Sequence, residues 1–164
     1  MRTLRATRWA RVSWWVCLSD PFDLRPVEGG AHLRASTVCW KGKALLIAGA
    51  SGSGKSSLAL ELMAFGAGLV ADDVTHLEIG DGLMARAPDT LPRAIEARGV
   101  GLLKAELVER AQVVAAIDLS SRVAARMPQE QSISLLGHSI PLLLRPATGP
   151  VAAMLLQYLK QVSL

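Results

Sequence analysis

Short apolar runs, most of them with glycine or proline nearby, recur along the chain and predict β-strands. They span residues 44–48, 68–71, 113–119, 132–136 and 140–144. Two further runs, 75–79 and 83–87, flank the turn Gly80-Asp81-Gly82 and predict a β-hairpin. Most of the predicted elements are therefore strands.

Two segments carry helical signals instead. Residues 55–65 place Leu58, Leu62 and Phe65 on one stripe, and glycines end the pattern at 66 and 68. Residues 151–162 form an apolar stretch that predicts a closing helix with a packing role. The segment from 95 to 110 is ambiguous between helix and strand, so no element is assigned there.

Composition indicates one globular domain. The chain has 164 residues, 51% of them hydrophobic and 20% charged, which is enough for one core and too few for two ordinary domains. No apolar stretch is long enough to cross a bilayer. Its two cysteines, Cys17 and Cys39, lie far apart without histidines at metal-ligand spacing, which argues against a disulfide framework or zinc site. We expect a soluble, cytoplasmic protein.

The first thirty residues differ from the rest. Four arginines in the first eleven positions account for much of the formal net charge of +4, and tryptophans are interleaved with them. Such a segment can bind nucleic acid or an anionic membrane, but a disordered arm or a start codon assigned too far upstream is the commoner explanation. We expect residues 1–30 to be an appendage, residues 31–164 to be the domain, and neither nucleic acid nor membrane to be a partner.

A phosphate-binding loop follows the first apolar run. The segment from 49 to 56 matches G-x-x-x-x-G-K-[ST], with a predicted strand before it and a predicted helix after it. In such a loop the backbone N–H groups cradle phosphates, the lysine reaches the β- and γ-phosphates, and the last hydroxyl contacts Mg²⁺. The residues predicted to bind nucleotide are Gly49, Ala50, Ser51, Gly52, Ser53, Gly54, Lys55 and Ser56.

Carboxylates suited to phosphoryl transfer lie downstream. The run 68–71 ends in Asp72-Asp73, and a carboxylate at that point can orient Mg²⁺ or accept a proton from an attacking hydroxyl. Side chains alternate along a strand, so the two aspartates should face different ways, and spacing does not say which is the base. Glu96 and Arg98 alternate in the same manner and could supply a carboxylate to Mg²⁺ and a guanidinium to phosphate.

These motifs together resemble the catalytic domain of HPr kinase/phosphorylase. The resemblance rests on the loop at 49–56, on Leu69-Val70-Ala71-Asp72-Asp73 and on the segment 95–101, and it covers roughly residues 35–159. It implies an α/β P-loop fold related to phosphoenolpyruvate carboxykinase, commonly assembled as a hexamer. It also implies an enzyme that uses ATP and Mg²⁺ to phosphorylate a serine of the phosphocarrier HPr, and that removes this phosphate with inorganic phosphate.

By the same resemblance, Lys55 would neutralise the transferring phosphate, and Ser56 and Glu96 would hold Mg²⁺. Asp73 is the first candidate for the base that takes the serine proton, and Asp72 the second. Arg98 and Arg145 would complete the catalytic set, with Arg145 standing in a loop shorter than that of the family.

The chain departs from the family upstream of the loop. Counting back from Gly49 places Arg34 where the family has a catalytic histidine, and His32 lies two residues away. An arginine stabilises phosphate charge but cannot relay a proton, so this departure affects the expectation of phosphorolysis more than that of kinase activity. The alternative function is a nucleotide-sensing regulatory module that binds a carrier or sensor kinase without catalysis.

Overall fold

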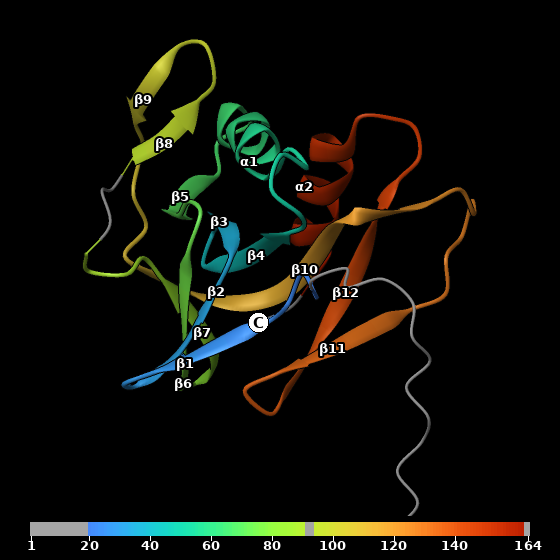
Figure 1. Cartoon of the computed structure of the whole chain (residues 1–164). Coiled ribbons are helices and arrows are strands. Elements are labelled where there is room, and N and C mark those ends of the chain that lie inside the picture. Colours follow the sequence, from blue (N-terminus) through green and yellow to red (C-terminus); the bar gives the residue numbers. More distant parts are fainter. Residues whose placement is uncertain (1–19, 91–93, 163–164) are drawn as a thin grey trace, which may run out of the picture.

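A curved ten-stranded sheet with two helices against one face dominates the structure (Figure 1). The computed structural model describes residues 20–90 and 94–162. Its strands are β1 (Leu24–Val27), β2 (Gly30–Leu33), β3 (Ala35–Trp40), β4 (Lys43–Ala48), β5 (Gly68–Ala71), β6 (Thr75–Gly80), β7 (Gly82–Arg86), β8 (Ala94–Ala97), β9 (Gly101–Lys104), β10 (Arg110–Val123), β11 (Gln131–Leu135) and β12 (His138–Pro146). The helices are α1 (Lys55–Ala64) and α2 (Val151–Gln161).

The long strand β10 organises the sheet. The sheet runs β1-β2-β6-β7-β10-β4-β3-β5, and β12 joins β10 as well, with β11 beyond it. Residues 110–112 of β10 pair antiparallel with β7, whereas residues 116–123 pair parallel with β12. On its other side β10 runs parallel to β4. The carboxyl ends of β4 and β10 therefore lie side by side, which is where the glycine loop begins.

Strand β4 is buried because both faces of the sheet are covered. Leu45 and Ile47 point into a core completed by α1 and α2, and Leu46 points into a second core enclosed by the curve of the sheet. A strand buried on both sides reads as a continuous apolar run, which is the pattern that the sequence has at 44–48.

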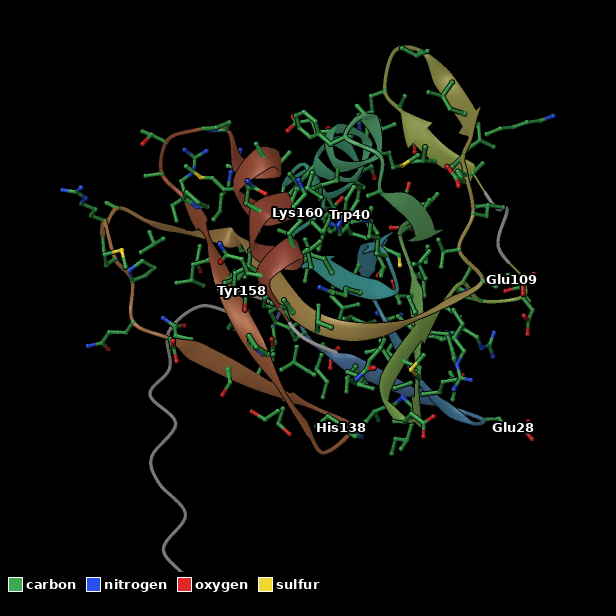
Figure 2. All side chains as sticks on the ribbon, turned by 180° about the vertical axis from the view of Figure 1, so that it is seen from behind. Glu28, Trp40, Glu109, His138, Tyr158 and Lys160 are labelled. Atoms are coloured by element: carbon green, nitrogen blue, oxygen red, sulfur yellow. The ribbon has the colours of Figure 1, made fainter. Side chains whose placement is uncertain are left out.

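The helix α2 is fixed at its carboxyl end to the edge of β3 and β4. The Lys43 side chain on β4 donates a hydrogen bond to the carbonyl of Leu159 at 3.0 Å, satisfying a group that the helix leaves unpaired. Lys160 lies over the ring of Trp40, 5.6 Å from its centroid, as Figure 2 shows with both side chains labelled. Both contacts hold α2 beside the strand that leads to the glycine loop.

Most predicted elements are confirmed. The helices at 55–65 and 151–162, the strand at 44–48 and the hairpin at 75–87 occur within about a residue of the expected bounds. The strand predicted at 113–119 is longer in both directions, and the ambiguous segment forms the separate hairpin β8–β9. The α/β class is also confirmed, with antiparallel pairs more numerous than parallel ones.

The boundary expected at residue 30 needs correction. Within the segment assigned to an appendage, β1 pairs antiparallel with β2, and Phe22 is buried in the second core. This strand was not predicted because Pro26 is typical of a turn. An edge strand has one side without hydrogen-bond partners, so a residue that lacks an N–H is tolerated there. Residues 20–30 therefore belong to the sheet, while the arginines and tryptophans of the first 19 positions lie outside the described residues. Among the described helices, neither is long and apolar enough to span a membrane.

Candidate active site

The glycine loop leaves the end of β4 and enters α1, as the sequence predicts (Figure 1). Gly49 has φ 145°, and a Cβ there would lie 2.7 Å from the Ser53 hydroxyl and 3.1 Å from Leu119 Cβ. Gly54 caps α1 in the left-handed conformation, with φ 96°. Both positions need glycine, the first for space and strain and the second for strain alone.

Lys55 folds back over its own loop. Its ammonium group donates hydrogen bonds to the carbonyls of Gly49 and Ala50, both at 3.0 Å. Burial lowers the pKa of Lys55, and Arg34 lowers it further, while Asp73 and Asp72 act in the opposite direction. A cation held only by loop carbonyls can exchange them for phosphate oxygens.

The Ser53 hydroxyl in the same loop is buried and has no hydrogen-bond partner among the described residues. The backbone carbonyl of Ser53 accepts a hydrogen bond from Arg145 on β12, at 3.4 Å. The structure thus brings Arg145, the candidate catalytic arginine of β12, against the loop.

Asp72 forms hydrogen bonds with three elements near the amino-terminal end of α1. Its Oδ1 accepts hydrogen bonds from the hydroxyl of Ser36 on β3 at 2.6 Å and of Ser56 on α1 at 2.9 Å. Its Oδ2 accepts the backbone N–H of Glu96 on β8 at 3.3 Å. A carboxylate with this many fixed donors is a positioning group, and its neighbour Ser56 is the predicted metal ligand.

Asp73 is held differently. Its backbone is left-handed, with φ 65°, and its side chain is 72% exposed. The only ion pair it makes within residues 20–90 and 94–162 is with Arg34, whose guanidinium lies 3.9 Å from Oδ1. The two aspartates therefore face different ways, as predicted. Asp72 is hydrogen-bonded within the protein, and Asp73 is exposed to solvent.

The predicted pair Glu96 and Arg98 lies exposed on the β8–β9 hairpin. Glu96 has an exposed side chain, and its backbone lies against Asp72. Arg98 lies beyond it in the turn of the β8–β9 hairpin, exposed, and no hydrogen bond or ion pair joins it to any described residue. The structure therefore places the Glu96 backbone beside Asp72 and gives Arg98 no polar contact with the described residues of the site.

The donors available to a metal are all hard oxygens. No group of three or more His, Cys, Asp or Glu side chains has metal-binding geometry in the described part of the chain. Mg²⁺ does not need one, since it keeps several waters and is bound through one or two carboxylates together with phosphates. Ser56, Asp72 and Glu96 supply such a set, so the residues present fit this ion.

Three supporting residues were not predicted. Ser120 accepts the N–H of Ala50 at 3.1 Å, and its own N–H donates to Asp118 Oδ1 at 2.7 Å. Asp118 is buried at the end of the apolar part of β10. With Ser36 below Asp72, these side chains fix the two ends of the loop. A polar residue that ends an apolar strand is the signal that could have found Asp118, since the same signal led to Asp72.

The histidines lie away from this cluster. His76 pairs with His32 across β2 and β6, where burial lowers its pKa and Arg86 lowers it further. His138 begins β12, at the tip of the β11–β12 hairpin (Figure 2). His32 thus pairs with β6, and Arg34, not a histidine, faces Asp73.

Comparison with known proteins identifies a matching family and similar sequences. The family model for the HPr Serine kinase C-terminal domain matches residues 31–123. HPr kinase/phosphorylase of Polaromonas naphthalenivorans is 48% identical over 64 residues, and that of Cupriavidus necator is 50% identical over 64 residues. Each match covers 38% of this chain and 20% of the relative, so the chain aligns with a fifth of these longer proteins.

The fold has a solved counterpart. The HPr(Ser) kinase/phosphatase from Coxiella burnetii superposes with a TM-score of 0.65 at 24% identity, over 79% of this chain and 88% of that one. The family match contains the loop, both aspartates and the Glu96 segment, and it extends over more than half of the chain. The resemblance seen in the sequence is confirmed, and the chain belongs to the family of HPr serine kinase C-terminal domains.

Proposed function

We propose that the protein is an ATP- and Mg²⁺-dependent serine-protein kinase that acts on an HPr-type phosphocarrier. The observation that carries the proposal is that two adjacent carboxylates beside a phosphate loop have different surroundings: Asp72 is hydrogen-bonded within the protein and Asp73 is exposed. Asp72 is fastened to Ser56, where a metal would lie, and Asp73 is open, where a second substrate can approach. A phosphoryl-transfer site needs one group of each kind.

Each residue then has one task. The loop N–H groups and Lys55 bind the β- and γ-phosphates, while Ser56, Asp72 and Glu96 hold Mg²⁺, which neutralises charge on those phosphates when bound. Asp73 accepts the proton of the substrate serine as its oxygen bonds to the γ-phosphorus and the bond to the β-phosphate oxygen breaks. Arg145 and Arg98 are proposed to bind phosphate charge, the first beside the loop and the second after movement of the hairpin.

The remaining predictions belong to the same proposal. They are a homo-oligomer, hexameric by family resemblance, a cytoplasmic location and no nucleic-acid or membrane partner. Removal of the phosphate by inorganic phosphate would require Asp73 to act as the acid, since forward and reverse reactions share a transition state.

Transfer of labelled γ-phosphate tests the proposal. The protein is incubated with labelled ATP, Mg²⁺ and HPr from the same source. We expect label on a serine of HPr that is lost in Lys55→Ala and Asp73→Asn and kept in Asp81→Asn, a matched change in the exposed turn between β6 and β7. Nucleotide binding without transfer, over a range of metal and phosphate concentrations, would overturn the kinase and favour a nucleotide-sensing regulatory module.

A further inference from the structure

Arg34, the single residue between β2 and β3, places an exposed guanidinium group beside Asp73. Arg34 follows Leu33, the last residue of β2, and precedes Ala35, the first of β3, and both neighbours are fully buried. Its side chain is 64% exposed and reaches toward Asp73 at 3.9 Å. The backbone at Arg34 is thus fixed on both sides, while its guanidinium remains free to reorient.

Lys55 belongs to the same charge cluster. Lys55 precedes Ser56, whose hydroxyl donates a hydrogen bond to Asp72, and Asp72 precedes Asp73, the partner of Arg34. Two cations and one open carboxylate thus lie at the same end of the glycine loop. Cations gathered in this way raise the local concentration of multiply charged anions and favour their binding.

The present partner of Arg34 is a weak one. An ion pair between exposed side chains adds little to stability, and at 3.9 Å this pair lacks hydrogen-bond geometry. A guanidinium binds phosphate oxygens through two parallel hydrogen bonds, which are stronger and more directional. A phosphoryl group placed between Lys55 and Asp73 would therefore compete well for Arg34.

We propose that Arg34 is a catalytic residue that binds the γ-phosphoryl group of the nucleotide in exchange for its contact with Asp73. The inference rests on the proposed phosphoryl-transfer function and assigns a residue to it. When nucleotide binds, Arg34 leaves Asp73 for the γ-phosphate oxygens. Asp73 is then released to face the incoming hydroxyl.

Arg34 stays charged throughout the transfer of the phosphoryl group. The serine oxygen bonds to phosphorus, its proton moves to Asp73, and the electron pair of the broken bond stays on the departing diphosphate. Arg34 and Lys55 offset the charge on the transferring group, and neither exchanges a proton, since a guanidinium stays protonated at working pH.

Nucleotide affinity tests the assignment without any protein substrate. Titration calorimetry in Mg²⁺ measures binding of ADP and of AMP-PNP, which carries a non-transferable γ-phosphoryl group. We expect Arg34→Gln to weaken AMP-PNP by about tenfold or more, the loss of a charge-assisted contact, while ADP changes by less than about twofold. Asp73→Asn should tighten AMP-PNP, because it removes both the competing partner and a like charge.

The matched control is Arg25→Gln on the edge strand β1, an exposed position in the same sheet, which should leave both affinities unchanged. Arg34 is exposed, so its substitution should leave the circular dichroism spectrum and melting temperature as they are. Equal loss of both nucleotides, or loss of neither, would overturn the assignment, as would failure of the unaltered protein to bind AMP-PNP. Selective loss in a protein that does not phosphorylate HPr would support Arg34 and refute the proposed substrate.

Discussion

Asp72 and Asp73 both follow the last residue of β5, Ala71, and they differ because the backbone turns left-handed at Asp73. Asp72 accepts hydrogen bonds from Ser36 and Ser56, whereas the Asp73 side chain is exposed. A non-glycine residue costs about 1 kcal/mol or more in that conformation, and such strain is found most often at functional sites. The left-handed turn at Asp73 is what separates the metal side of the site from the substrate side.

Substituting the two aspartates separately should therefore give different kinetics. Asp72→Asn keeps the hydrogen bonds from the serines but removes a charge beside the metal position, so it should raise the Mg²⁺ concentration for half-maximal rate by about tenfold or more. Asp73→Asn should lower kcat by about a hundredfold or more, as loss of a general base does, and leave the Mg²⁺ requirement unchanged. Phosphate transfer measured across a Mg²⁺ series distinguishes them. Identical Mg²⁺ profiles for the two variants would contradict the division of roles.

Glycines in the loop are required for different reasons, and stability should reveal it. Gly49→Ala meets the Ser53 hydroxyl at 2.7 Å in addition to backbone strain, so we expect a loss of about 2–4 kcal/mol in the free energy of unfolding. Gly52→Ala meets nothing within 4 Å and should cost only about 1 kcal/mol for its φ of 79°. Urea unfolding of both variants measures the difference. Equal losses would mean that the contact with Ser53 relaxes freely.

At the scale of elements, the β8–β9 hairpin is the most loosely attached part of the site. It forms its own two-stranded sheet and projects beyond α1 (Figure 1). All of β9 is exposed, and Leu102 is 64% exposed, yet Ile95 on β8 is fully buried in the core against the helices. Ile95 therefore anchors the hairpin and, one residue further, the position of Glu96.

Removing this anchor should free the hairpin before it unfolds the domain. We expect Ile95→Ala to cost about 2–4 kcal/mol and to speed amide hydrogen exchange in residues 94–104 more than in β4 or β10. Leu102→Ala is the matched control, since its side chain is already exposed and should cost less than about 0.5 kcal/mol. Exchange followed by mass spectrometry resolves the segments. A uniform increase over the whole domain would show that the hairpin is not a separate unit.

Local signals explain which elements were predictable. The unit from β4 through the loop to α1 has its strand pattern, glycines and helix stripe in one continuous segment, so Lys55 and Ser56 followed from the sequence. The ends of β10 are polar and exposed, and β8–β9 mixes buried Ile95 with exposed leucines, so neither shows a clean period of two. β1 was missed because its proline and arginine are typical of turns.

The site itself combines local and distant information. Asp72 and Asp73 were found because an apolar strand ends there, but the roles of Ser36, Asp118 and Ser120 depend on pairing of β3 and β10 with β4. Such register is set by the whole sheet and cannot be read from any one segment. The contact between Arg34 and Asp73 is of the same kind, since it joins the β2–β3 link to the end of β5.

At the scale of the whole molecule, the sheet curves until β6 lies beside β3. The hydroxyls of Thr37 and Thr75 are 2.6 Å apart and both are buried, and Thr75 also donates to the carbonyl of Ala35 at 3.0 Å. This closure encloses the second core, whose open end is covered by Phe22 and β1. The strands that hold Arg34 and Asp73 are thus fixed partly by residues near the start of the described chain.

Truncation at two points tests whether that start belongs to the domain. A chain beginning at Asp20 keeps every contact described above and serves as the reference for urea unfolding. A chain beginning at Ala31 loses β1 and the burial of Phe22, which is 6% exposed. We expect it to lose about 3 kcal/mol or more, the cost of removing a buried phenylalanine, and to bind AMP-PNP more weakly because the β2–β3 link is less constrained. Equal stability of the two chains would restore the boundary at residue 30, because β1 would then add nothing to the fold.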